Sequence, residues 1–130
     1  MRRQFQLPPE DVAALNGTGL EWETVMEGQV TWLVLPHFPI PSGYNHSVVS
    51  AALRIPPSYP DNQIDMVFFN PPLSLSSGRT IRQLSDVSFD GKIYQQWSRH
   101  RTAENPWRSD IDNVGTHLLL VNDWLLRELG

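Results

Sequence analysis

The order of apolar and polar positions predicts a helix at each end of this chain of 130 residues. Residues 7–19, LPPEDVAALNGTG, begin with two prolines and two acids, which suit the positive first turn of a short helix. Gly17 is expected to end that helix. Residues 109–129 carry apolar side chains at spacings of three and four, which is typical of a long amphipathic helix. Ser109 and Asp112 resemble a capping box at its start.

Four stretches between the two helices are predicted to be β-strands. They are residues 20–28 (LEWETVMEG), 29–38 (QVTWLVLPHF), 46–55 (HSVVSAALRI) and 63–69 (QIDMVFF). Their connections are short, so an antiparallel meander is expected, and Pro36 should end the second strand. The pattern weakens from residue 70 to 106, where only FDGKIYQQW suggests a short strand. This part is predicted to be a long irregular crossing.

These elements together predict an α+β fold. Its architecture is a two-layer sandwich, a four-stranded antiparallel meander with a short N-terminal helix and a long C-terminal helix packed on the sheet. The length suits one domain, and no linker or repeat divides the chain, so residues 1–130 are expected to fold as a single unit.

Composition and charge exclude several classes of function. The net charge is −4, so a nucleic-acid partner is not expected. No run of eighteen apolar residues exists and the N-terminus lacks an apolar signal region, so no membrane association is expected and the protein is predicted to be cytoplasmic. The chain has no cysteine, which excludes a thiolate metal site and a cysteine nucleophile. No cofactor is predicted, and no metal site, because the histidines lack metal-ligand spacing. They are His37, His46, His100 and His117.

Prolines are concentrated between the third and fourth predicted strands. Residues 54–73, RIPPSYPDNQIDMVFFNPPL, hold five of the chain's eleven prolines. Pro57 and Pro60 lack backbone donors, so this link cannot pair as an interior strand. Pro60 also favours an extended backbone at Tyr59. The Tyr59 ring is expected to cover the end of the sheet, with its hydroxyl on a polar group.

Pro56, Tyr59 and Pro60 stand as the Pro-x-x-Tyr-Pro elbow that characterises the ubiquitin-conjugating (E2) superfamily. The order of helix, meander, elbow, crossing and helix also resembles that family. The resemblance covers nearly the whole chain, most specifically residues 44–70, and it implies the UBC-like fold.

Other parts of the chain depart from the E2 pattern. The family's His-Pro-Asn after the fourth strand is replaced by Asn70-Pro71-Pro72. FDGKIYQQW is similar to the segment that carries the catalytic cysteine in that family, and Tyr94 stands at the cysteine position. The ordinary pKa of a tyrosine is about 10, so little phenolate is present at neutral pH and Tyr94 is no substitute for a thiolate.

A single-domain, cysteine-less chain of this kind is most similar to the prokaryotic E2-like proteins of family E. That resemblance implies three partners: a ubiquitin-like protein with one domain or with tandem domains, an E1-like activating enzyme, and a JAB-type metallopeptidase.

The segment after the cysteine position, YQQWSRHRTAENPWR, is rich in basic and aromatic residues. His100 is the candidate general base or nucleophile, because imidazole titrates near neutral pH. A binding surface for a tail that ends in a carboxylate is a second interpretation. In a third, the tryptophans only anchor an irregular loop. The candidate binding residues are Trp97, Ser98, Arg99, Arg101 and Trp107.

Three hypotheses about function follow. The first is an E2-like protein that binds a ubiquitin-like protein or its E1-like enzyme without a cysteine thioester. The second is an active conjugation factor with His100 as the nucleophile. The third is a structural interaction module related to RWD domains, with no link to ubiquitin-like chemistry.

Overall fold

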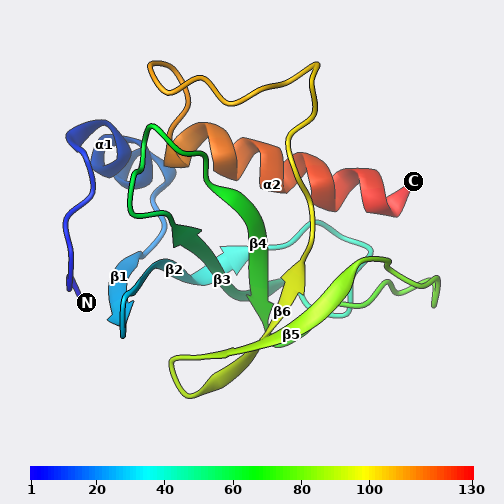
Figure 1. Ribbon diagram of the computed structural model, residues 1–130. Helices are drawn as coiled ribbons and strands as arrows, with labels where there is room; N and C mark the ends of the chain where they lie inside the picture. Colours follow the sequence, from blue (N-terminus) through cyan, green and yellow to red (C-terminus); the bar gives the residue numbers. More distant parts are fainter.

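The computed structural model describes residues 1–130 and contains two α-helices and a six-stranded antiparallel sheet (Figure 1). The strands lie in the order β1-β2-β3-β4-β6-β5 across the sheet. In chain order the elements are α1 (Pro9–Thr18), β1 (Glu23–Glu27), β2 (Val30–Pro39), β3 (Val48–Ile55), β4 (Asp65–Asn70), β5 (Leu84–Phe89), β6 (Lys92–Trp97) and α2 (Val114–Leu129).

The predicted α+β class and the antiparallel meander of β1 to β4 are confirmed, and the architecture is consistent with the UBC-like fold. The predicted number of four strands was wrong, because the crossing after β4 contains the β5–β6 hairpin and β6 pairs with β4. The hairpin turns at Asp90 and Gly91, which both have positive φ angles, 55° and 72°. This is the geometry that a two-residue Asp-Gly turn favours.

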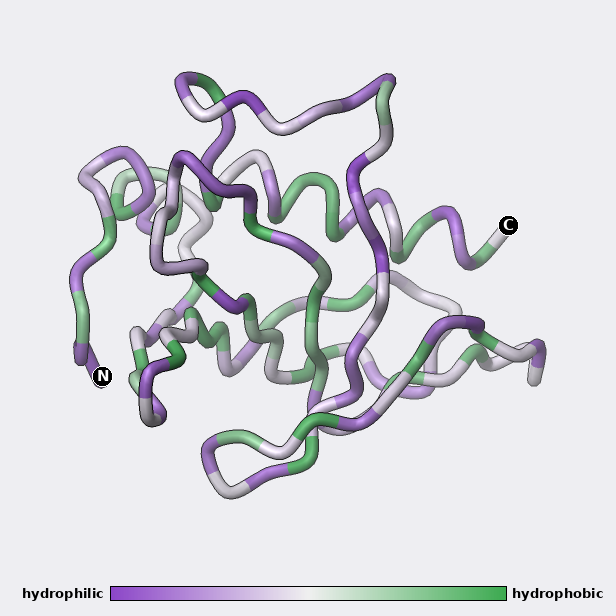
Figure 2. The backbone as a smooth tube through the Cα atoms, in the orientation of Figure 1, coloured by the Kyte–Doolittle hydropathy of each residue, from purple (hydrophilic) through white to green (hydrophobic).

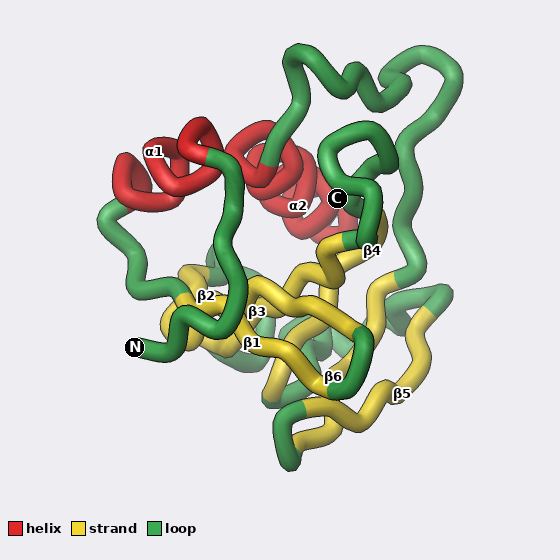
Figure 3. The backbone as a smooth tube through the Cα atoms, turned by 60° about the vertical axis from the view of Figure 1, so that its left-hand side comes forward, coloured by secondary structure: helices red, strands yellow, loops and turns green.

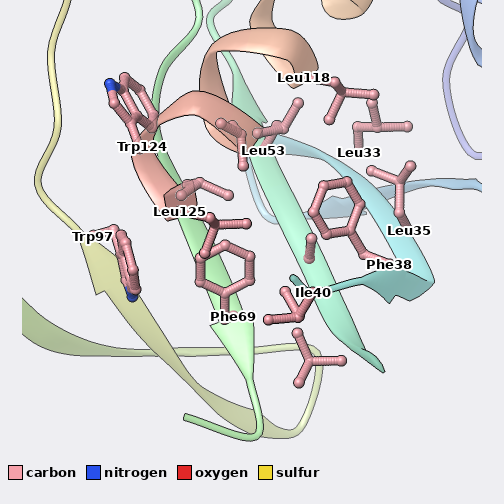
Figure 4. Packing of buried hydrophobic residues seen from close by; sticks show 14 of the residues in the cluster. Leu33, Leu35, Phe38, Ile40, Leu53, Phe69, Trp97, Leu118, Trp124 and Leu125 are labelled. Atoms are coloured by element: carbon pink, nitrogen blue, oxygen red, sulfur yellow. The ribbon is translucent and has the colours of Figure 1, made fainter. Parts of the chain in front are cut away.

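The apolar core lies on both sides of the sheet. The larger cluster fills the space between the sheet and the two helices, where Phe69 and Trp97 of the sheet pack near Leu125 of α2 (Figure 4). A second cluster on the opposite face joins Trp32, Phe68 and neighbouring strands without a helix. Figure 3 shows both helices on one side of the sheet. No helix is long and apolar enough to cross a membrane.

The long helix begins later than predicted. α2 starts at Val114, and its cap is Asn113 rather than Ser109. The Asn113 side chain accepts a hydrogen bond from the Thr116 N–H, and the Thr116 hydroxyl accepts one from the Asn113 N–H. The reciprocal pair satisfies two N–H groups at the helix start, and Asp112 instead accepts a bond from the Arg108 N–H in the preceding loop.

Two further boundaries differ from the predictions. α1 does not end at Gly17 but runs to Thr18, and Gly19 takes the left-handed conformation that closes it, with φ 73°. Pro36 does not end β2, because the strand continues after a register shift between Leu35 and Phe38. A proline has no backbone N–H to donate, and it is tolerated where the pairing of two strands is irregular.

The elbow forms a turn outside the sheet, as its prolines predict. Tyr59 donates a hydrogen bond from its hydroxyl to Oδ1 of Asp11, at 2.8 Å, so the expected polar partner is present. The same oxygen accepts a bond from the N–H of Val114, at 2.9 Å. The elbow tyrosine therefore connects the first turn of α1 with the first turn of α2, and the Tyr59–Pro60 peptide bond is cis.

Candidate functional site

Alternation along β6 sends neighbouring side chains to opposite faces of the sheet. Tyr94 points into the cluster on the open face, whereas Gln95 and Trp97 point toward α2. The candidate residues of this strand therefore do not share one surface.

Tyr94 is a core residue. Its side chain is buried with Phe89, at a ring distance of 5.0 Å, and its hydroxyl lies 3.0 Å from Oγ of Ser50. Burial raises the pKa of the Tyr94 hydroxyl, because the charged phenolate is poorly solvated there. The hydroxyl stays neutral and has a partner, so the position that the resemblance assigns to the cysteine holds a weak nucleophile.

A shallow cleft of about 330 Å³ lies over the Ser50–Tyr94 hydroxyl pair. Asn70 and Pro71, which replace the His-Pro-Asn of the E2 pattern, line the same cleft. The two segments that were compared with E2 motifs thus meet in space. Between them they present hydroxyl and amide groups and the ammonium of Lys92, but no thiol and no free carboxylate.

Trp97 does not lie on the predicted binding surface. It is fully buried, packs edge-to-face with Phe69 at 5.4 Å, and donates from Nε1 to Oε1 of Gln95. Gln95 also binds the backbone N–H and C=O of Leu73, so all of these polar groups are satisfied. Trp97 is an apolar anchor, which corrects its interpretation as a contact residue.

The basic residues that follow β6 are engaged within the chain. Arg99 lies over the Trp97 ring at 5.0 Å and pairs with Glu128 of α2 at 3.4 Å. Glu128 also pairs with Arg79 at 3.4 Å, so one carboxylate lies between two guanidinium groups. The neighbouring Ser98 accepts a bond from the side chain of Gln96.

Arg101 and Trp107 hold the loop between β6 and α2 in place. The Arg101 side chain is almost completely buried, 3.4 Å from Asp112 and 5.1 Å above the Trp107 ring. Trp107 donates from Nε1 to the carbonyl of Pro60 at 2.8 Å. These contacts favour the interpretation of both residues as anchors of a loop that is otherwise largely hydrophilic (Figure 2).

His100 is the most exposed of the predicted residues. Its Nδ1 lies 2.8 Å from Oδ2 of Asp65, the first residue of β4. Asp65 also accepts a bond from the N–H of Met66, and that N–H reaches the carbonyl of Arg99 at 3.2 Å. Met66 has φ 59°, a conformation that costs a non-glycine residue roughly 1–3 kcal/mol. The surrounding contacts hold this strained backbone in place.

His100 and Tyr94 do not form one site. Asp65 and His100 are at the start of β4, whereas Asn70 and the Tyr94 cleft are at its end. A strand rises about 3.3 Å per residue, so the two places are roughly 16 Å apart. The prediction placed both residues in one catalytic segment, but Tyr94 lies within β6 and His100 lies three residues beyond the end of that extended strand.

His117 was missed as a polar core residue. It is fully buried in α2, and its Nε2 donates to the carbonyl of Met66 at 2.9 Å, while Nδ1 has no partner. Burial lowers the pKa of His117 to about 4. Burial also raises the pKa of Asp11, which the sequence suggested only as a helix-end charge. The helical spacing marks His117 as core-facing, because it stands three residues after Val114 and four before Val121, whereas no comparable signal marks Asp11.

The class defined by this fold is an E2-like α+β domain without a cysteine. The model of a protein family described as Prokaryotic E2 family E matches residues 7–128, so this chain belongs to that family. The comparison with curated proteins and the comparison with solved structures gave no match.

Proposed function

We propose that this protein is a binding component of a ubiquitin-like conjugation or processing system and forms no cysteine thioester. Its partners are a ubiquitin-like protein and the E1-like enzyme that activates it, with a JAB-type metallopeptidase as a further component. The observation that carries the proposal is the family match over nearly the whole chain, combined with a buried, hydrogen-bonded tyrosine at the position that the resemblance assigns to the cysteine.

The contact with the ubiquitin-like protein is proposed to involve its C-terminal carboxylate. Arg79 and Arg99 already bind one carboxylate, that of Glu128, at 3.4 Å each. Guanidinium groups recognise carboxylates well, and both pairs are long enough to be weak. An incoming terminal carboxylate can therefore replace Glu128 between the two arginines.

A carboxylate site formed by Arg79 and Arg99 changes the roles expected for the basic residues that follow β6. Arg101 is buried against Asp112 and Trp107, so it supports the loop instead of contacting a partner. Arg99 is partly exposed and remains a contact candidate, and Arg79 joins it from the segment before β5.

Isothermal titration calorimetry with the ubiquitin-like protein of the same organism tests the proposal without ATP. Arg99→Ala should weaken binding roughly tenfold, which corresponds to about 1.4 kcal/mol. Glu128→Gln should strengthen binding, because it removes the internal competitor. Arg127→Ala is the matched control, since Arg127 is on the same turn of α2 but pairs with Asp123.

Two results would contradict the proposal. If Glu128→Gln weakens binding as much as Arg99→Ala, the ion pair supports the fold and is not a competitor for the site. If the wild-type protein binds neither the ubiquitin-like protein nor the E1-like enzyme, the hypothesis of a structural interaction module is favoured.

A further inference from the structure

The Asp65–His100 pair leaves one imidazole nitrogen free. A carboxylate only accepts hydrogen bonds, so Nδ1 of His100, 2.8 Å from Oδ2 of Asp65, carries the proton. Nε2 then keeps its lone pair and makes no hydrogen bond within the chain. The imidazole is 58% exposed, so this lone pair is accessible to a molecule in solution.

The pair is braced from three directions. The Asp65 carboxylate accepts a bond from the N–H of Met66 at 3.1 Å. That N–H also binds the carbonyl of Arg99, which fixes the residue before His100 to the strand. From the side of the sheet that faces α2, Nε2 of His117 donates a hydrogen bond to the Met66 carbonyl at 2.9 Å. The backbone around the pair is therefore positioned by the sheet, by the loop and by the helix.

A second exposed pair shows what an unbraced contact looks like. His37 lies 3.5 Å from Glu21, and both side chains are more than 60% exposed, at 68% and 62%. Neither Glu21 nor His37 makes another side-chain hydrogen bond. The two pairs have the same composition of imidazole and carboxylate, but only the pair at Asp65 has a short contact and a fixed carboxylate.

We propose that His100 is a nucleophile toward activated acyl groups, such as acyl phosphates, acyl adenylates and reactive esters, and that Asp65 is its positioning residue. This activity goes beyond the proposed binding function and does not depend on it. A chain without cysteine has few other side chains that attack an acyl carbon at neutral pH, and imidazole is one of them.

The reaction balances without a cofactor. The Nε2 lone pair attacks the acyl carbon, a C–N bond forms, and the bond to the activating oxygen breaks, so the phosphate or phenolate leaves with the electron pair. The Asp65 carboxylate stabilises the positive charge of the acyl-imidazolium through the Nδ1–H bond. An amine or water then attacks the acyl carbon, the neutral imidazole leaves, and the surplus proton passes to solvent.

Hydrolysis of p-nitrophenyl acetate by the full chain tests the proposal without any protein partner. His100→Asn should lower the protein-dependent release of p-nitrophenolate at least about tenfold, and Asp65→Asn should lower it to an intermediate rate. A cinnamoyl ester should give the ultraviolet spectrum of an acyl-imidazole with the wild-type protein, weaker with Asp65→Asn and absent with His100→Asn. A structural role for Asp65 alone would not change that spectrum.

His37→Asn is the matched control, and thermal melting of every variant checks that the fold is kept. The proposal expects the rate of His37→Asn to equal that of the wild type. It is overturned if His100→Asn hydrolyses the ester at the wild-type rate, or if His37→Asn and His100→Asn lose equal activity, which is the behaviour of ordinary surface imidazoles. Because no ubiquitin-like protein is used, this failure is separate from a failure of the binding proposal.

Discussion

The two ends of β4 present opposite chemical environments. At the Asn70 end, Tyr94 and Ser50 form a neutral hydroxyl pair above a well-packed apolar cluster. At the Asp65 end, a hydrogen-bonded imidazole–carboxylate pair is exposed to solvent beside a strained residue. The family resemblance assigns chemistry to the first end, where the exposed imidazole of His37 also lines the cleft, whereas the short, braced imidazole–carboxylate pair lies at the second end. Similarity to an enzyme family identifies a position but not the group that occupies it.

The largest difference between the two ends should appear in stability. Tyr94→Ala removes a buried aromatic ring and should lower the free energy of unfolding by roughly 4 kcal/mol. His100→Ala removes an exposed hydrogen bond to a carboxylate and should cost less than about 1 kcal/mol. Urea unfolding of both variants measures this difference. Equal losses would show that the His100 loop is as important to the fold as the core beneath Tyr94.

The buried histidine below the Asp65 end should make stability depend on pH. The pKa of His117 is about 4 in the folded protein, against an ordinary value of 6.5, so the unfolded chain binds more protons between these values. Stability should therefore fall as the pH drops from about 7 to 4, by about 3 kcal/mol in total.

Other titratable groups change stability outside the range from pH 7 to 4, or change it in the opposite direction. The raised pKa of Asp11 opposes the loss near the acid end of the range, and the lowered pKa values of Glu23 and Asp90 add losses only below their ordinary range. His117→Gln should flatten the curve between pH 7 and 5, as followed by thermal melting. A wild-type curve that is already flat there would show that His117 is not buried as a neutral imidazole.

The two tyrosine hydroxyls should differ by a smaller amount. Tyr59→Phe removes a donor to the buried carboxylate of Asp11 and should cost about 1.5–3 kcal/mol, because that carboxylate already has one oxygen without a partner. Tyr94→Phe removes a neutral bond to Ser50 and should cost about 1 kcal/mol. Chemical denaturation measures the loss of stability in the two variants. A larger loss for Tyr94→Phe than for Tyr59→Phe would contradict this ranking of the two hydroxyls.

The sequence predicted the meander, both helices and the elbow because each depends on local patterns. Alternation, helical spacing and proline positions are local signals. The hairpin at Asp90 and Gly91 also has one, since Asp-Gly is a strong two-residue turn signal, but β5 carries too many polar residues to be recognised as a strand.

The site was harder to predict, because its contacts join residues far apart in the chain. His100 was predicted as a candidate from its chemistry, but its contact residue Asp65 lies 35 positions earlier. Trp97 was wrongly predicted to lie on a binding surface. Adjacent side chains of a strand point to opposite faces of the sheet, so a shift of one residue in register decides whether a side chain is buried. Arg79 and Glu128 meet Arg99 only when the loop before β5 and the end of α2 fold together.

Peptide mass spectrometry tests the central claim most directly. The chain and its Tyr94→Phe variant are incubated with the ubiquitin-like protein, the E1-like enzyme and ATP, and both are examined for acyl groups and for binding. We expect no acyl group on Tyr94, and the same affinity for the ubiquitin-like protein in both chains. An acyl group that maps to Tyr94 and is lost in Tyr94→Phe would contradict the claim that this position is structural.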